Sequence, residues 1–471
     1  MIGTRQLILF LRTLFYSAGT GAFVMIIGAL AASVLWTFRH KTLARLLKPL
    51  FILSCVMIFV PPYVHALAWA DLFYRYGIEG LGASLWVMVM ALLPVGLGFS
   101  LLGFYLVEDA MVEAGRTLNR DSIVMKSIIL PIAMPALLTG MIFSFLWTVH
   151  DFSVPSLFFV NIYSLEIFAK YSATNNPFEP FMLSLPMIVV ATLIIILISS
   201  LSKKLMLGLR KGHTKESLPL VMPLWFRCLQ IIAIVILPVQ ISTPMISLIM
   251  KVAKPSNIWI SILQARRELG FTLLLSTLTA TLSVIFALLL AKRVVEAESR
   301  HKLLLWVCIL FPLAIPAPLV GIGLVTLFSQ RGMGFIYGTL WMPVLANMIR
   351  FAPLAVVTLS VQLKRMDQGL LDSASVFQKN RIHGFIRVYL PMILPGLISA
   401  FLIVFILTTG ELGATLLVSP PGRSTLTMRI YNYMHYGSSQ MIAGLCLTML
   451  ALSLSTGLIV YRVFSKTGGD R

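Results

Sequence analysis

Three ionisable residues lie in stretches that are otherwise strongly apolar. Asp151 follows the segment WTVH, Glu411 follows LTTG, and Arg350 lies within NMIRFAPLA. An ionisable side chain at membrane depth costs about 2.5–3.5 kcal/mol on insertion scales, so such residues are usually functional. If a solute crosses the membrane beside these residues, two carboxylates next to its translocation path would favour a cation. The alternative interpretation is structural, with both acids at the membrane–water boundary or paired with Arg350. Candidates for the path are Asp151, Glu411, Gly410, Arg350, Thr148 and Thr408.

The composition indicates which elements must position these residues. The chain has 471 residues, of which 58% are hydrophobic and 11% are charged, whereas soluble domains carry about 25% charged residues. A membrane-spanning helix needs roughly 20 mainly apolar residues. We therefore predict an all-α polytopic membrane protein with about eleven transmembrane helices, over 13–37, 48–71, 83–107, 131–151, 180–202, 226–250, 270–292, 303–328, 337–360, 391–417 and 440–463.

The distribution of Lys and Arg predicts the orientation of these spans. Most of the 37 Lys and Arg residues fall in alternate loops, starting with the loop 38–47, and such loops are cytoplasmic in membrane proteins. This places the N-terminus outside and the C-terminus in the cytoplasm. The same bias explains the net charge of +20, and without a soluble basic domain no nucleic-acid partner is expected.

The chain contains an internal duplication. LPIAMPALLTGMIFSFLWTVHD (130–151) aligns without gaps with LPMILPGLISAFLIVFILTTGE (390–411), so Thr148 falls on Thr408 and Asp151 on Glu411. Upstream, Thr13 falls on Thr272, with the first loop one residue shorter. The shift is by an even number of spans, so the repeats run parallel. We predict a first half at 1–203 with about five helices, a polar linker at 204–225, and a second half at 226–471 with about six helices.

A cytoplasmic loop with mixed charges precedes the Leu-Pro pair in each repeat. Pro suits a first helical turn, so Leu-Pro alone marks only the start of a helix. Two such loops in matching places are longer than connectors require.

These loops resemble the EAA loop of ABC importer permeases, in which Glu-Ala-Ala is followed by Gly and later by Leu-Pro. The first copy reads Glu113-Ala114-Gly115 with Asn119 at the usual Gly, and the second reads Asp372-Ser373-Ala374 with Gln378 there. Two such halves in one chain are similar to the fused permeases of the ferric-iron and thiamine type. That resemblance implies twelve helices, of which this chain shows eleven candidates.

The resemblance also implies partners and a mechanism. Each loop would dock on one of two copies of a cytoplasmic ABC ATPase, a periplasmic substrate-binding protein would deliver the solute, and ATP-driven closure would alternate access across the bilayer of the bacterial inner membrane. This suits the loops, because their small residues would allow close approach and their charges would fix register. The docking residues that the resemblance implies are Glu113, Ala114, Gly115, Arg116, Asn119, Leu130, Pro131, Asp372, Ser373, Ala374, Gln378, Leu390 and Pro391. The chain has no G-x-x-x-x-G-K-[ST] motif. We therefore expect a transport subunit with no catalytic residues, no metal site and no cofactor of its own, and ATP-Mg on the partner ATPase.

Two segments on the outer side echo each other more loosely, at 164–177 and 425–437. Their aromatic, amphipathic character suits helices in the membrane interface, and the resemblance suggests instead a surface for the binding protein. We further expect Asp151 and Glu411 to face each other near the outer part of the path.

Other functions stay open at this point. The first alternative is a secondary transporter driven by an ion gradient, a class that often uses inverted repeats. A membrane enzyme would need clustered catalytic residues, whereas the histidines are scattered. Ferric iron is the favoured solute, with thiamine, a phosphonate or a polyamine as alternatives.

Overall fold

The computed structural model describes residues 3–38, 42–174, 176–208, 220–330, 332–366, 369–370, 380–436 and 439–468. Within them, nine helices are long and apolar enough to cross a membrane, and two bent helix pairs raise the number to eleven. The predicted all-α membrane fold is confirmed. The chain divides into two compact units, residues 1–175 with 182–253, and residues 176–181 with 254–471.

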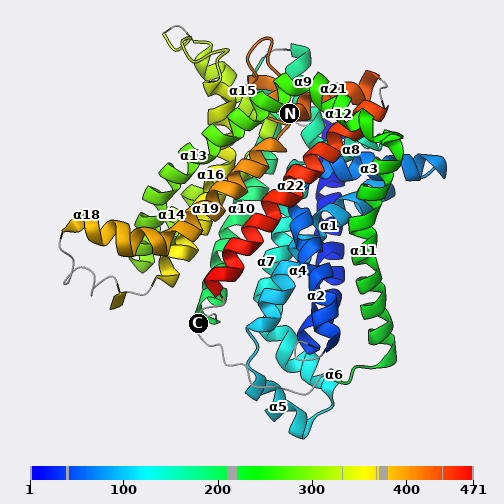
Figure 1. The fold of residues 1–471 in the computed structure, drawn as a ribbon, viewed down its shortest axis with the longest axis vertical. Helices are drawn as coiled ribbons and strands as arrows, with labels where there is room; N and C mark the ends of the chain where they lie inside the picture. Colours follow the sequence, from blue (N-terminus) through cyan, green and yellow to red (C-terminus); the bar gives the residue numbers. More distant parts are fainter. Residues whose placement is uncertain are drawn as a thin grey trace. The chain divides into compact units, whose positions relative to one another are not determined.

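The core of the first unit is a bundle of α1, α4 and α7, which lie side by side in Figure 1. Because Gly28 of α1 and Gly96 of α4 carry no side chain, these two backbones approach closely, as membrane helices do at small residues. The elements of this unit are α1 (Thr4–Thr37), α2 (Thr42–Val56), η1 (Met57–Phe59), α3 (Pro62–Arg75), α4 (Leu81–Tyr105), α5 (Asp109–Leu118), α6 (Asp121–Val124), η2 (Met125–Ile129), α7 (Leu130–His150), α8 (Ser153–Leu157), α9 (Tyr163–Thr174), α10 (Phe178–Gly208) and α11 (Leu224–Val252).

The second unit repeats this plan with α13, α16 and α19 as its core helices. Helix α22 packs against α19 and α12. The elements are α12 (Pro255–Gln264), α13 (Arg266–Glu296), α14 (Ser299–Leu310), η3 (Phe311–Ala314), α15 (Ala317–Phe328), α16 (Trp341–Arg365), α18 (Arg381–Gly384), η4 (Phe385–Tyr389), α19 (Leu390–Thr409), α20 (Thr415–Val418), α21 (Leu426–Tyr436) and α22 (Ser439–Gly468).

The second predicted span of each repeat is sharply bent. The helical segments Arg45–Phe59 and Pro62–Arg75 meet at 107°, and His301–Ala314 and Ala317–Phe328 meet at 92°. Proline follows the first segment of each pair, and proline both lacks the N–H group of a continuing helix and clashes with the preceding turn. The predicted spans 48–71 and 303–328 are therefore broken helices in both units.

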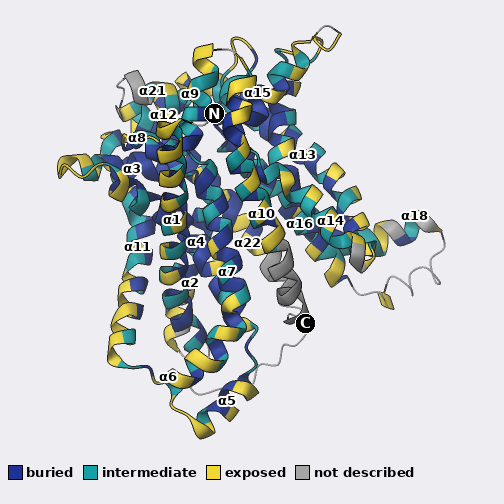
Figure 2. Cartoon of the chain, turned by 180° about the vertical axis from the view of Figure 1, so that it is seen from behind, coloured by how far each residue is buried: buried dark blue, intermediate teal, exposed yellow. Residues whose placement is uncertain are grey.

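Helix α11 packs in the first unit, although the sequence assigns residues 226–471 to the second half. Its polar side chains explain this difference. Gln240 donates to the backbone oxygen of Met90 at 3.1 Å and pairs with Ser54, and Gln230 donates to Ser33 at 2.7 Å. The opposite side of α11 shows exposed, mainly apolar residues (Figure 2), which suits contact with lipid. The division by packing therefore falls at residues 253 and 254.

The structure matches the predicted repeat at one specific contact in each unit. The Thr13 hydroxyl oxygen accepts a hydrogen bond from the backbone N–H of Tyr163 at 2.9 Å, and Thr272 accepts one from Leu426 at 2.8 Å. The first long helix of each unit thus holds the start of the helix predicted at the interface, α9 or α21. Because Thr13 aligns with Thr272, their partners Tyr163 and Leu426 are equivalent positions, and α9 corresponds to α21 in the two repeats.

Candidate functional site: the repeated loop and the two acidic turns

The first predicted docking loop forms the short helix α5, which lies with α6 at one end of the first unit (Figure 1). Its inner face is buried through Asp109, Val112 and Gly115. Val112 belongs to a hydrophobic cluster with Trp36 and Phe104 from the long helices. The exposed face carries Met111, Glu113, Ala114 and Leu118, of which Leu118 is 85% exposed. Helix α5 is thus anchored on one side and presents an apolar and charged surface on the other.

An ion pair fixes α5 relative to the helix that follows. Arg116 donates from Nε to Asp121 Oδ1 at 2.9 Å and from an η nitrogen to Oδ2 at 3.3 Å, with both side chains mostly buried. This two-point geometry is more specific than a single contact. Arg116 therefore sets the angle between α5 and α6, rather than lying on the exposed surface as a docking charge.

The predicted linker between the halves ends against this loop. The backbone N–H of Val221 donates to Asp121 Oδ2 at 2.5 Å. Leu220 and Met222 on either side are buried in the same hydrophobic cluster as Val112. The segment 220–223 leads directly into α11, so α11 is coupled to the docking loop through Asp121. Sequence reasoning missed this contact, for which the only signal is the apolar residues at the end of a polar linker.

The small residues of the loop have separate functions. A methyl group on Gly115 would lie 2.5 Å from Ile128 Cδ1, so Gly115 allows α5 to pack on the next helix. Ala114 is exposed, as the docking hypothesis expects. Asn119 ends α5 with an extended backbone at φ −138°. This position does not use the left-handed conformation that favours glycine, which explains why Asn is accepted there.

The Leu-Pro pairs do not start their helices, which corrects the sequence prediction. The helix runs without a break from Asp121 to His150, and in the second repeat from Ile382 to Thr409. A single π-helical turn precedes each pair, at Met125–Ile129 and at Phe385–Tyr389. Proline removes one backbone hydrogen bond and its ring crowds the preceding turn, and a wider π turn accommodates both effects. Pro131 and Pro391 thus sit within continuous helices, just after equivalent π turns.

The second docking loop can be compared only in part. The predicted docking residues Asp372, Ser373, Ala374 and Gln378 lie outside the described residues. The described segment from Arg381 to Pro391 repeats the helix and π turn of the first copy.

The two predicted acidic residues occupy equivalent turns. The N–H of Asp151 donates to the oxygen of Thr148 at 3.2 Å, and the N–H of Glu411 donates to Thr408 at 3.2 Å. Asp151 Oδ1 then accepts from the N–H of Val154 at 3.1 Å, and Glu411 Oε1 accepts from Ala414 at 2.8 Å. Each carboxylate therefore caps the short helix that follows, α8 or α20, where backbone N–H groups lack helical partners.

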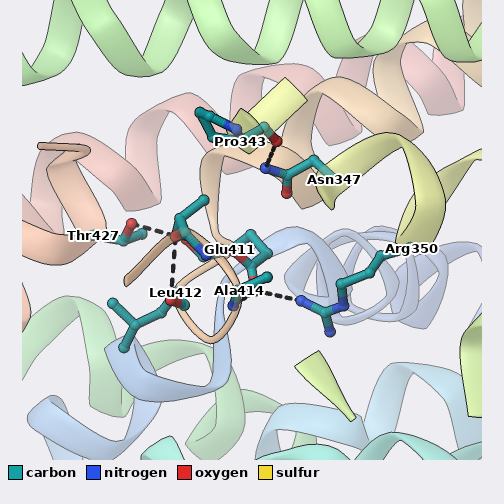
Figure 3. Close-up of polar contacts among 8 residues, drawn as sticks. Pro343, Asn347, Arg350, Glu411, Leu412, Ala414 and Thr427 are labelled. Carbon is teal, nitrogen blue, oxygen red and sulfur yellow. Dashed lines mark hydrogen bonds and ion pairs between the residues drawn. The ribbon is translucent and has the colours of Figure 1, made fainter. Parts of the chain in front are cut away.

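Glu411 has a second partner in Arg350, as one of the sequence hypotheses proposed. The two side chains form an ion pair (Figure 3), and the Glu411 side chain is only 1% exposed. Its Oε2 also accepts from the N–H of Thr415 at 2.9 Å. Both carboxylate oxygens are thus occupied within the second unit. The position equivalent to Arg350 in the first unit is Ala91, so the first unit has no arginine at this place.

The other predicted path residues lie close to these turns. Thr148 is buried and its hydroxyl donates to Ser144 at 2.8 Å. Thr408 is also buried, and Gly410 ends α19 with φ −90°, a conformation open to any residue. The predicted span 391–417 therefore ends earlier, at Thr409, because the acidic turn interrupts it. Whether Asp151 and Glu411 face each other stays a prediction.

Sequence reasoning did not find the ion pairs that join the first helix of each unit to its interface helix. Arg5 of α1 pairs with Glu166 of α9 at 3.2 Å, and Glu268 of α13 pairs with Arg429 of α21. Once Tyr163 is aligned with Leu426, Glu166 falls on Arg429. Equivalent positions of the interface helices thus carry opposite charges, and their partners lie one helical turn apart on α1 and α13 in the register of Thr13 and Thr272.

Comparisons with known proteins agree with the motif. Residues 283–468 match the family described as "Binding-protein-dependent transport system inner membrane component". The permease protein PhnV of Salmonella paratyphi A, named for 2-aminoethylphosphonate transport, is 29% identical over 165 residues, which cover 35% of this chain and 62% of PhnV. This chain therefore spans less than two thirds of that relative's length.

A second relative matches both repeats. The Fe(3+)-transport system permease protein FbpB 2 of Haemophilus influenzae is 24% identical over 396 residues, covering 79% of this chain and 74% of that protein. A solved bacterial ABC transporter involved in the import of the acidic polysaccharide alginate gives a TM-score of 0.41 at 19% identity, covering 50% of this chain and 95% of that one. The second half of the chain is thus similar to the inner membrane components of binding-protein-dependent transport systems, and most of the chain resembles permease proteins of such systems.

Proposed function

We propose that this chain is the membrane subunit of an ATP-driven importer, which receives a small solute from a periplasmic binding protein and releases it into the cytoplasm by alternating access. The family supports this class of function. The ATPase is a separate protein that holds ATP-Mg. Two ATPase copies would bind, one at each repeated loop.

The observation that carries this proposal is the exposed face of α5. A short helix at the polar end of a membrane bundle normally exposes polar residues, whereas α5 exposes Met111, Ala114 and Leu118 at helical spacing beside Glu113. Exposed apolar residues framed by charge are typical of a protein interface. The buried opposite face and the Arg116–Asp121 pair hold α5 rigid. A push on α5 would therefore be transmitted to the helix that runs from Asp121 to His150.

The proposed orientation follows from the same elements. The α5 end of the first unit and the α18 end of the second unit lie in the cytoplasm, and α9 and α21 lie on the periplasmic side of the inner membrane. The concentration of Lys and Arg in alternate loops supports this arrangement, because such loops are cytoplasmic by the positive-inside rule. The C-terminus is then cytoplasmic.

Ferric iron is the proposed solute, because the FbpB 2 relative is similar across both repeats whereas PhnV covers a smaller part of the chain. A phosphonate, thiamine or a polyamine are the alternatives. Asp151 and Glu411 are the proposed contacts for a cation, and Glu411 also binds Arg350 and two backbone N–H groups.

Co-purification and reconstitution test this function. The chain, expressed with its ATPase, should retain two ATPase copies, and Leu118→Asp should release the ATPase from the first loop and abolish transport without lowering thermal stability. Leu118→Met, which keeps an apolar side chain of similar size, is the matched control. Wild-type transport in Leu118→Asp would reject docking through α5. Uptake of Fe³⁺ or 2-aminoethylphosphonate, each with a cognate binding protein, then decides the solute.

The same preparation distinguishes a secondary transporter. An importer requires ATP and the ATPase for uptake into proteoliposomes, whereas a secondary transporter would accumulate solute with an imposed ion gradient alone. Gradient-driven uptake in the absence of ATP would overturn the proposal.

A further inference from the structure

The two units present different chemistry at equivalent surface positions, at the end of the first unit where α9 lies and at the end of the second unit where α21 lies. In the second unit this surface carries Arg266 and Arg267, the first two residues of α13, and Arg423 in the loop before α21. All three side chains are exposed. The Arg423 guanidinium lies 5.8 Å from the Phe271 ring centroid. Phe271 follows Arg267 by one helical turn, which brings Arg423 and Arg267 to the same part of the surface.

The basic trio, Arg266, Arg267 and Arg423, is not neutralised within the described part of the chain. The nearby acid Glu268 is already paired with Arg429, which also donates to the Tyr433 hydroxyl oxygen at 2.8 Å. No ion pair involves any member of the basic trio among the described residues. Three positive charges are therefore available to a partner.

Two physical effects make positive charge unfavourable at these positions, so we expect a function that compensates for them. Basic residues at a helix N-terminus are disfavoured by the helix dipole, by about 0.3–1 kcal/mol each at an exposed site. Positive charge on the periplasmic side also opposes the positive-inside bias. An acidic partner would offset both penalties.

The first unit has no positive charge at the three equivalent positions. In the register that places Thr13 on Thr272, Arg266 and Arg267 correspond to Leu7 and Ile8, which are 50% and 53% exposed. In the register that places Tyr163 on Leu426, Arg423 corresponds to Val160, which is 6% exposed. The positions that carry the basic trio in the second unit thus carry apolar residues in the first.

We propose that the basic trio docks an acidic patch on one lobe of the substrate-binding protein, so that the binding protein seats in a single orientation. This inference rests on the proposed importer function. Two identical docking surfaces in a duplicated permease would accept a two-lobed protein in either of two orientations. Charge on only one of them makes one orientation favourable, and the wrong orientation leaves the acidic patch against Leu7 and Ile8.

The test uses the full chain with its ATPase in nanodiscs and the binding protein that supports uptake in reconstitution. Replacing the basic trio by Gln should weaken binding of that protein about tenfold or more, mainly through slower association, and the loss should shrink as salt is raised. Arg12→Gln is the matched control, because Arg12 is exposed on α1 and its equivalent is Phe271. Unchanged affinity and salt dependence in the triple variant would overturn the inference while the importer function stands.

Two further measurements sharpen the result. Introducing Leu7→Arg and Ile8→Arg creates a second basic surface, and site-specific cross-linking should then detect the binding protein in two orientations instead of one. A single orientation in this variant would contradict the proposal. Vesicles of neutral or anionic phospholipid without binding protein test the other source of anions. If the triple variant changes only its dependence on anionic lipid, the basic trio binds headgroups and the proposal fails.

Discussion

The hydroxyl oxygen of Thr13 accepts a hydrogen bond from the backbone N–H of Tyr163 at 2.9 Å, and the same hydroxyl donates to the Leu9 oxygen within its own helix at 2.8 Å. Thr272 repeats both contacts, with Leu426 and with Glu268. Each threonine is about 1% exposed. The contact satisfies an N–H group at the start of α9 or α21, where no helical carbonyl is available.

Loss of this hydroxyl is expected to destabilise the contact between the helices. Thr13→Val and Thr272→Val keep the side-chain shape but leave a buried N–H without a partner, which costs about 1–3 kcal/mol. The melting temperature of each variant in detergent should fall, and Thr→Ser should restore it. Thr277→Val is a control, because that exposed hydroxyl donates only to Leu273 within its own helix. A wild-type melting temperature in Thr13→Val would show that the N–H finds another partner.

The reversed ion pairs predict which charge substitutions are tolerated. Arg429→Glu places two acids together in a mostly buried contact, whereas Arg5→Glu does so where Arg5 is 77% exposed. Arg429→Glu should therefore lower folded yield much more than Arg5→Glu, since exposed pairs contribute little. The double variant Glu268→Arg with Arg429→Glu should recover most of the yield, because it restores opposite charges at the same two positions. Size-exclusion chromatography of the detergent-solubilised chain measures this recovery, and equal losses in the single and double variants would contradict it.

The close approach of Gly28 and Gly96 predicts that adding a methyl group in the first unit lowers stability more than removing one at the equivalent position of the second unit. A Cβ on Gly28 would lie 2.4 Å from the Gly96 carbonyl carbon, whereas the equivalent residues in the second unit are Ala287 and Ala355, both buried. Gly28→Ala is expected to destabilise by about 1–3 kcal/mol through overpacking, and the reverse change Ala287→Gly by less. Thermal unfolding of both variants compares them directly. Equal, small effects would mean that α1 and α4 separate at little cost.

The hydrogen bonds of Asp121 join the first predicted docking loop to the segment that leads into α11, and we expect this connection to matter for coupling. Asp121 accepts hydrogen bonds from Arg116 and from the N–H of Val221. Asp121→Ala removes both contacts, so ATP hydrolysis should continue while solute uptake per ATP falls severalfold. Asp109→Asn, also in the loop and buried, serves as a comparison that leaves the Arg116 contact intact. Parallel losses of hydrolysis and uptake in Asp121→Ala would indicate impaired ATPase docking instead of impaired coupling.

The sequence was sufficient for the membrane class and for the duplication, because these depend on apolar length and on repeated local patterns. It failed where a contact joins distant segments, and where a helix contains an irregular turn. Pro131 predicted a helix start because sequence patterns do not show that a π turn can accept the proline. Gln240 and Gln230 did not reveal that α11 packs in the first unit, because their partners are Ser54, Met90 and Ser33 on other helices.

The two acidic turns lead to opposite predictions for their neutral variants. Glu411→Gln leaves Arg350 without its ion-pair partner in a largely buried site, so folded protein should decrease severalfold, as the removal of one partner of a buried pair is strongly destabilising. The double variant Arg350→Met with Glu411→Gln should recover folding, which shows that the pair is structural. Asp151→Asn keeps an oxygen that can accept from Val154 and Ser153, so expression should be normal. If Asp151 contacts a cationic solute, uptake should nevertheless fall about tenfold or more, in line with the loss of a charge-assisted contact. Wild-type uptake in Asp151→Asn at normal expression would remove Asp151 from the path and leave both acids as helix caps.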